Sequence, residues 1–231
     1  LTENICYEKD RKRMKYYNLS ENIIACDNFL PQQKLDEIYS DLLNNRQAFQ
    51  PPSWSNEKNN TAYFFLSSPT FNTTELFSDK CGGLDFWLLN KTKQDNNSFV
   101  ESLHKWLMHQ GFEYFIKDNG APIYDFLKRN LEWNIHVISY NNGGYYNWHK
   151  DSSMSTLFTF NLILNRGKTL KGGDLLFYDK EIIEVKNKNN FFVVFPSYIP
   201  HAINPVYTED KKDVPFLEQR FSIQFWVRFQ K

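Results

Sequence analysis

The second half of the chain alternates apolar and polar residues with a period of two, which is typical of β-strands. In residues 131–140, one face carries Trp133, Ile135 and Val137, and the other carries Asn134, His136, Ile138 and Tyr140. The pattern returns at 155–165 and 220–229, and shorter strands are predicted at 174–179, 181–185 and 191–196. At least six strands with no helix between them predict a β-sandwich or barrel.

The first half of the chain is expected to be helical or irregular. Residues 31–45 predict a helix, because Leu35, Ile38, Leu42 and Leu43 recur at helical spacing after Pro31. Further helices are predicted at 97–112 and 121–129, and residues 47–97 are expected to be a long connecting region. We therefore expect one domain over 1–231, α+β but mainly β. A helical and loop part (1–130) would pack on one outer face of a β core (131–231).

Composition narrows the class of partner. The 27 basic and 27 acidic residues balance, so there is no cationic surplus for a nucleic acid backbone. No apolar run is long enough to span a membrane. The three cysteines form no C-x-x-C pair, which favours a reducing, cytoplasmic compartment. Because the sequence begins at Leu1 and not at Met, an organelle or secretory signal upstream is the alternative.

The chemistry of the chain is expected at His149 and Asp151. Residues two apart on a strand point to the same side, so this imidazole and carboxylate can face one ion. His201, the only later histidine, follows the strand predicted at 191–196 and supplies a possible third ligand. Two histidines and one carboxylate form the facial triad of non-heme Fe(II) oxygenases. A solvated turn is the alternative interpretation of an isolated H-x-D.

The surroundings of the H-x-D pair favour the metal site. The spacing Y-x-x-G-x-x-Y-x-x-H-x-D begins at Tyr140, and Gly172-Gly173-Asp174 follows. His201 lies in P-x-x-x-P-H-x-x-x-P-V, and Arg220-x-Ser222 begins the last strand. Together these motifs resemble the 2-oxoglutarate/Fe(II)-dependent dioxygenase superfamily over residues 131–229, and most closely its prolyl 4-hydroxylase-like branch.

The resemblance implies a double-stranded β-helix (jelly-roll) core and an enzyme that uses Fe(II), 2-oxoglutarate and molecular oxygen, with ascorbate as a possible accessory reductant. It implies that His149, Asp151 and His201 bind the metal. The distal carboxylate of 2-oxoglutarate would bind Arg220, assisted by Ser222 and Tyr140. The residues of the last strand agree, because its other face is apolar and must pack, which turns Arg220 inward.

Two departures bear on the substrate. The prolyl hydroxylases usually have Lys at the position of Arg220, and here a polar insert, 206–219, follows His201. We therefore expect hydroxylation, desaturation or oxidative cyclisation at a C–H bond of a small metabolite or amino acid. The loops 47–97 and 206–219 would then lie over the barrel mouth, and an ordinary surface loop is the alternative for the insert. His136 and Asn134 are expected either to line the cavity or, for His136, to be a hydrogen-bonded core histidine.

Three alternatives stay open. A peptidyl-prolyl hydroxylase would take a short peptide. A nucleic-acid dealkylase fits less well, because Ser222 replaces the Asn of the R-x-N-x-x-x-R pattern of that branch and because the net charge is zero. A non-enzymatic jelly-roll module would use the cavity for a sugar or small ligand, but it would have no need of both the triad and Arg220.

Overall fold

A computed structural model describes residues 15–49, 81–89, 131–151, 156–210 and 212–229. The predicted helices at 97–112 and 121–129 lie outside the described residues. No helix in the described ranges is long and apolar enough to cross a bilayer. The elements are, in chain order, β1 (Lys15–Asn18), β2 (Ile24–Asp27), α2 (Gln32–Asn44), η1 (Arg46–Ala48), β3 (Cys81–Leu89), β4 (Leu131–His149), β5 (Thr156–Asn165), β6 (Lys171–Gly172), β7 (Leu175–Asp179), β8 (Glu181–Val185), β9 (Phe191–Pro196), β10 (His201–Ile203), β11 (Val206–Tyr207), η4 (Phe216–Glu218) and β12 (Arg220–Phe229).

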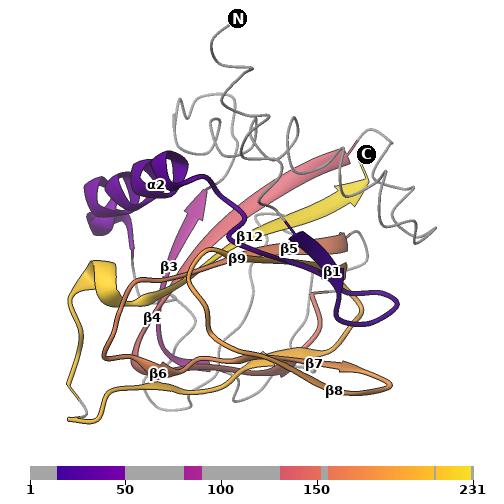
Figure 1. Ribbon diagram of the computed structural model, residues 1–231. Helices are drawn as coiled ribbons and strands as arrows, with labels where there is room; N and C mark the ends of the chain where they lie inside the picture. The colour runs from indigo at the N-terminus through magenta and orange to yellow at the C-terminus, as the bar shows by residue number, and fades with distance from the viewer. Residues whose placement is uncertain (1–14, 50–80, 90–130, 152–155, 211, 230–231) are drawn as a thin grey trace, which may run out of the picture.

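Most of the strands form one curled antiparallel sheet in the order β1-β2-β9-β5-β12-β4-β10-β7-β8, with β3 also paired to β4. Strand β4 joins the two layers seen in Figure 1. Its first part pairs with β12, and its last residues pair with β10. The short pair β6 and β11 is separate. This arrangement confirms the predicted jelly-roll class and its mainly β composition.

Side chains alternate between the two faces of β12, and each face is buried on a different side of the sheet. Phe221, Ile223 and Phe225 are buried in a cluster that also contains the apolar face of α2. Arg220, Ser222 and Gln224 are buried on the opposite face, which points to the interior between the two layers. The second apolar cluster fills that interior around β7, β9 and the middle of β4. The predicted inward orientation of the Arg220 face therefore agrees with the fold.

Helix α2 confirms the prediction at 31–45 and packs on an outer face of the sheet. It buries Leu35, Ile38, Tyr39 and Leu42. Leu43 was expected in the same apolar stripe but is 49% exposed. One step of 100° carries its side chain past the contact with the sheet.

Two strands of the first half, β1 and β3, were not predicted. Residues 15–18 lie in the half that we expected to be helical or irregular, but they form β1 and pair with β2. Residues 81–89 lie inside the region expected to be irregular, but they form β3 along β4. Strand β1 is held by pairing with the nearby β2, and β3 by pairing with the distant β4, and neither pairing is revealed by local pattern.

Candidate metal centre and carboxylate site

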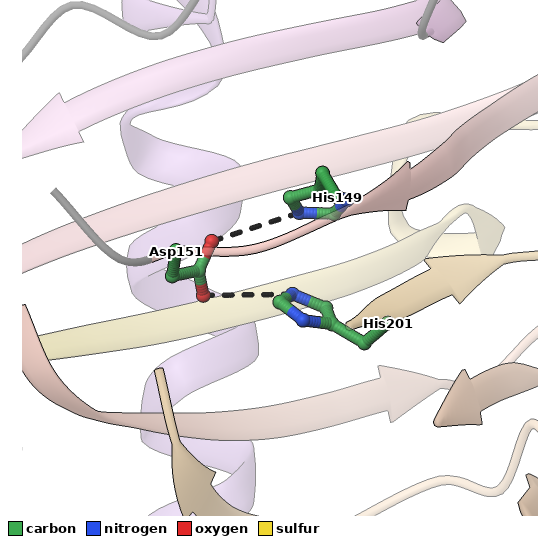
Figure 2. Close-up of side chains that lie close together, drawn as sticks. All are labelled: His149, Asp151 and His201. Carbon is green, nitrogen blue, oxygen red and sulfur yellow. Dashed lines mark ion pairs between the residues drawn. The ribbon is translucent and has the colours of Figure 1, made fainter. Parts of the chain in front are cut away.

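The three predicted metal ligands come together. His149 ends β4 and His201 begins β10, and the two are Cα partners in the antiparallel register. Asp151 Oδ1 lies 3.6 Å from His149 Nε2, and its Oδ2 lies 3.5 Å from His201 Nε2, as Figure 2 shows. One potential ligand atom from each residue lies within 4.8 Å of the other two, so the three could hold one metal ion.

The route by which these residues meet differs from the prediction in two respects. Asp151 lies two residues beyond the end of β4, so it reaches the site from the following segment and not from a shared strand face. The strand at 191–196 does not run beside β4, because β9 pairs with β2 and β5. It is the next short strand, β10, that aligns His201 with His149.

Both histidines are oriented to present Nε2. The backbone carbonyl of Asn147 lies 2.8 Å from His149 Nδ1, and that of Ile199 lies 3.1 Å from His201 Nδ1. A carbonyl can only accept, so each Nδ1 carries the hydrogen and each Nε2 keeps a lone pair. Such second contacts commonly fix the tautomer of metal-binding histidines. The donor set therefore fits a divalent cation.

Asp151 is held in place by a neighbour on β5, Thr159. The hydroxyl of Thr159 donates a hydrogen bond of 2.6 Å to its Oδ2. Burial raises the pKa of Asp151, while His201, Thr159 and the indole of Trp226 act in the opposite direction. A divalent ion among the three ligands would favour the ionised carboxylate and offset the cost of burial. The geometry and the chemistry of the donor set thus agree.

Arg220 is completely buried between the layers. Its Nε donates to the carbonyl of Gly173 at 2.9 Å, and its Nη1 donates to the Ser222 hydroxyl at 2.9 Å. The guanidinium carbon lies 4.8 Å from the centre of the Tyr140 ring. Arg220 Nη2 is buried and has no hydrogen-bond partner within the described ranges. The structure therefore brings Arg220, Ser222 and Tyr140 together and leaves a buried N–H donor for an anion.

Burial also acts on the charge of Arg220. It lowers the pKa of the guanidinium, while Tyr140 and Asp174 counteract this effect. A guanidinium remains protonated in proteins, so the site is a buried cation without a carboxylate in hydrogen-bonding contact. A carboxylate ligand would supply the missing partner.

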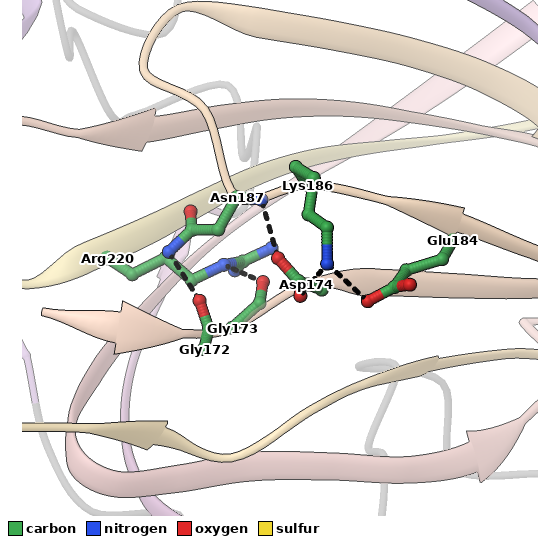
Figure 3. Close-up of polar contacts among 7 residues, drawn as sticks. All are labelled: Gly172, Gly173, Asp174, Glu184, Lys186, Asn187 and Arg220. Carbon is green, nitrogen blue, oxygen red and sulfur yellow. Dashed lines mark hydrogen bonds and ion pairs between the residues drawn. The ribbon is translucent and has the colours of Figure 1, made fainter.

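Gly173 lies beside Arg220, as seen in Figure 3, and its lack of a side chain leaves room for the arginine. Both glycines have positive φ, of 71° and 72°. A Cβ on Gly173 would lie 2.8 Å from Arg220 Cδ and 2.9 Å from Asn187 Nδ2. Asn187 donates to the carbonyl of Gly172 and, through its backbone N–H, to Asp174. Gly172 ends β6 and Gly173 follows it, and this connection to β7 also positions the arginine.

Sequence reasoning missed Thr159 and Asn187. Thr159 lies on a predicted strand, but only the pairing of β5 with β12 and β9 carries it toward Asp151. Asn187 lies in a polar connection with no distinguishing pattern. His136 was predicted in two ways, and the structure places its buried ring against Trp226, with centroids 4.2 Å apart. Asn134 belongs to a part of β4 whose side chains are outside the described set.

The described part of the insert 206–219 is anchored to β4 and to the outer apolar cluster. The side chains of Asn142 and Asn141 accept from the backbone N–H groups of Thr208 and Val214. Phe216 of η4 is buried in the outer apolar cluster. Asn141 and Asn142 follow Tyr140, which is the Cα partner of Arg220. The prediction for 47–97 falls largely outside the described residues.

Comparison with known proteins bears on the enzyme class. The family described as the 2OG-Fe(II) oxygenase superfamily matches residues 135–228, which include every predicted site residue. The chain carries a 2OG-Fe(II) oxygenase domain. This confirms the predicted resemblance, the enzyme class and the cofactors Fe(II), 2-oxoglutarate and molecular oxygen, whereas ascorbate stays a prediction. A search of curated protein sequences finds no match.

Solved structures share the oxygenase fold at low sequence identity. A prolyl 4-hydroxylase from Pseudomonas putida is 16% identical with a TM-score of 0.56, over 90% of this chain and 93% of that one. A Trichoplax adhaerens prolyl hydroxylase, solved with a hypoxia inducible factor peptide, is 14% identical with a TM-score of 0.57, over 98% and 92%. A viral collagen prolyl hydroxylase from Paramecium Bursaria Chlorella virus-1, in a 2OG complex, is 14% identical with a TM-score of 0.53, over 90% and 97%.

Proposed function

We propose that this oxygenase couples the oxidative decarboxylation of 2-oxoglutarate to oxidation of a C–H bond in a small metabolite or amino acid. In this proposal His149, Asp151 and His201 bind Fe(II). Arg220 binds the distal carboxylate of 2-oxoglutarate, with Ser222 and Tyr140 beside it. The whole chain, 1–231, acts as one catalytic domain.

The observation that carries the proposal is the pair of complementary buried sites. Two imidazole Nε2 atoms and a carboxylate converge within 4.8 Å, and they are 6% exposed or less. Arg220, on the inner face of the same barrel, buries an N–H group without a partner among the described residues. A metal ion would be bound by the ligand atoms of the first site, and a carboxylate would accept the hydrogen bond of the second.

The bound Fe(II) and 2-oxoglutarate would supply the oxidising chemistry: one oxygen atom of O2 enters succinate, CO2 leaves, and the other atom is available to oxidise the substrate. The chain's own residues orient the reactants. The carbonyls of Asn147 and Ile199 fix the imidazole tautomers, and Thr159 holds the carboxylate of Asp151. The buried walls exclude water, which strengthens the contact of Arg220 with an anion.

Peptidyl-prolyl hydroxylation is the second candidate. It is supported by the fold shared with three solved prolyl hydroxylases, one of them with a bound peptide. Two departures of the sequence from the prolyl hydroxylases favour a small molecule instead: Arg at position 220 and the polar insert 206–219. The nucleic-acid alternative is disfavoured by the balanced charge of the chain.

The test is succinate formation from 2-oxoglutarate by Fe(II)-loaded protein. A panel of free amino acids, small metabolites and proline-containing peptides is added one compound at a time, with mass spectrometry of each product. We expect a small molecule to accelerate succinate release and to gain one oxygen atom or lose two hydrogen atoms. Stimulation by proline peptides alone would select the second candidate. Absence of any metal-dependent turnover of 2-oxoglutarate would contradict both.

A further inference from the structure

We propose that His136, Asn161 and Gln224 form a second hydrogen-bonding subsite, which holds the oxo-acid end of the bound cosubstrate. This inference rests on the proposed function, in which 2-oxoglutarate extends from Arg220 toward the triad. We call these three residues the polar row.

The strand register places the polar row in one patch. Gln224 on β12 is the Cα partner of His136 on β4 and of Asn161 on β5. Cross-strand partners carry their side chains on the same face, with Cβ atoms about 5 Å apart. Gln224 is also four residues from Arg220 on one strand, so both face the barrel interior.

The members of the polar row are buried but incompletely paired. His136, Asn161 and Gln224 are 3%, 1% and 3% exposed. His136 Nε2, Asn161 Oδ1 and Gln224 Oε1 have no hydrogen-bond partner in the described part of the chain. A buried polar atom without a partner is costly and rare, and three neighbours in one patch indicate a place for a polar ligand.

The polar row lies on the path between the carboxylate site and the triad. The guanidinium of Arg220 bends along β12 to Ser222, and Gln224 is the next residue on that face, about 7 Å further along the strand. At the other end, Thr159 is two residues from Asn161 on the same face of β5, and its hydroxyl donates to Asp151 at 2.6 Å. A five-carbon diacid held by Arg220 and reaching toward the triad must pass these three side chains.

The chemistry of the polar row suits an oxo acid. Burial lowers the pKa of His136 to about 3, so its imidazole is neutral. Oxygens of an oxo acid only accept, so Asn161 and Gln224 would bind them through their side-chain N–H groups, with rotation about the last torsion turning the amide oxygens away. The row therefore hydrogen-bonds carbonyl and carboxylate oxygens without adding charge. Arg220 recognises charge at one end of the cosubstrate, and the row recognises the oxygens at the other.

The experiment is calorimetric titration of 2-oxoglutarate into Zn(II)-loaded protein, which measures binding without turnover. Asn161→Leu and Gln224→Leu keep a similar volume but remove the amide, and each should weaken binding about three- to tenfold. Gln33→Leu, the same change at an exposed position of α2, should leave the affinity unchanged. Gln224→Met serves if the Leu variant does not fold, because Met adapts to irregular space.

Unchanged 2-oxoglutarate affinity in folded Asn161 and Gln224 variants would overturn the inference and would assign the row to the primary substrate or to the core. Failure of the proposed function looks different. In that case the wild-type protein itself would not bind 2-oxoglutarate when loaded with Zn(II).

Discussion

Arg220 is the residue on which cosubstrate recognition depends in this account. Arg220→Ala removes a charge-assisted contact worth roughly 1.5–3 kcal/mol, so the KM for 2-oxoglutarate should rise about tenfold to a hundredfold. Arg220→Lys should be intermediate, because the charge remains but the planar fork is lost. Initial rates over a range of 2-oxoglutarate concentrations measure the effect. An unchanged KM in Arg220→Ala would assign this role to another cation.

Gly173 supports Arg220 through its lack of a side chain. In Gly173→Ala a Cβ would meet Arg220 and Asn187 at under 3 Å, in a backbone conformation that already strains an L residue. Strain of this kind costs about 1–3 kcal/mol, so urea unfolding should show that loss together with weaker 2-oxoglutarate binding. Gly143→Ala is the matched control, since Gly143 has φ +83° but no heavy atom within 4 Å of the Cβ position. Equal effects on binding in both variants would contradict the positioning role.

His136 makes stability depend on pH in a definite direction. Its folded-state pKa of about 3 lies below the ordinary value of 6.5, so the unfolded chain binds more protons between these values. The stabilising contribution of His136 to the free energy of unfolding is complete above pH 6.5 and is lost as the pH falls toward 3. It amounts to roughly 2 kcal/mol between pH 8 and pH 5. The His136→Leu variant should lose correspondingly less stability over this range, as measured by urea unfolding in the presence of EDTA. Parallel pH profiles of variant and wild type would contradict the assignment.

The site residues differ in how far the sequence predicts them. His149, Asp151, His201 and Arg220 stand in spaced motifs, so their types and distances along the chain are sufficient. Thr159 and Asn187 could not be predicted, because ordinary polar residues acquire a role only when distant strands bring them to a ligand or a charged group.

At the scale of elements, helix α2 offers a clean test of the outer core. Leu42 is fully buried against the sheet, whereas its neighbour Leu43 is 49% exposed. Leu42→Ala should lower the free energy of unfolding by about 2–5 kcal/mol, and Leu43→Ala should change it by less than about 0.5 kcal/mol. Because α2 lies outside the barrel, neither change should alter metal stoichiometry. Comparable losses at the two positions would contradict this packing.

The strands of the second half were predictable, because each buries one apolar face and so alternates in sequence. Strand β4 was predicted only to Tyr140, but it continues to His149. Its second part includes Gly143 and several polar residues, which follow no apolar alternation and are held by pairing with β3 and β10. The two-residue strands β6 and β11 are likewise too short to show an apolar alternation from which they could be predicted.

For the molecule as a whole, ligand binding should be coupled to stability. An ion and a cosubstrate that bind the folded chain alone stabilise it by mass action, by about 2.7 kcal/mol for a ligand at a hundred times its Kd. Zn(II) with 2-oxoglutarate should therefore raise the Tm of the wild-type protein more than Zn(II) alone. The increment due to 2-oxoglutarate should be lost in Arg220→Ala. An equal increase in Tm in both proteins would show that 2-oxoglutarate does not bind at Arg220 in the barrel interior.

The central claim is that His149, Asp151 and His201 bind one Fe(II). It is tested most directly by the iron content of protein loaded without oxygen and freed of excess metal, in wild type and in His201→Ala. We predict about one iron per wild-type chain and a large loss in the variant, because two ligands cannot replace the three-ligand site. A His201→Ala protein that retains one iron per chain would contradict the account.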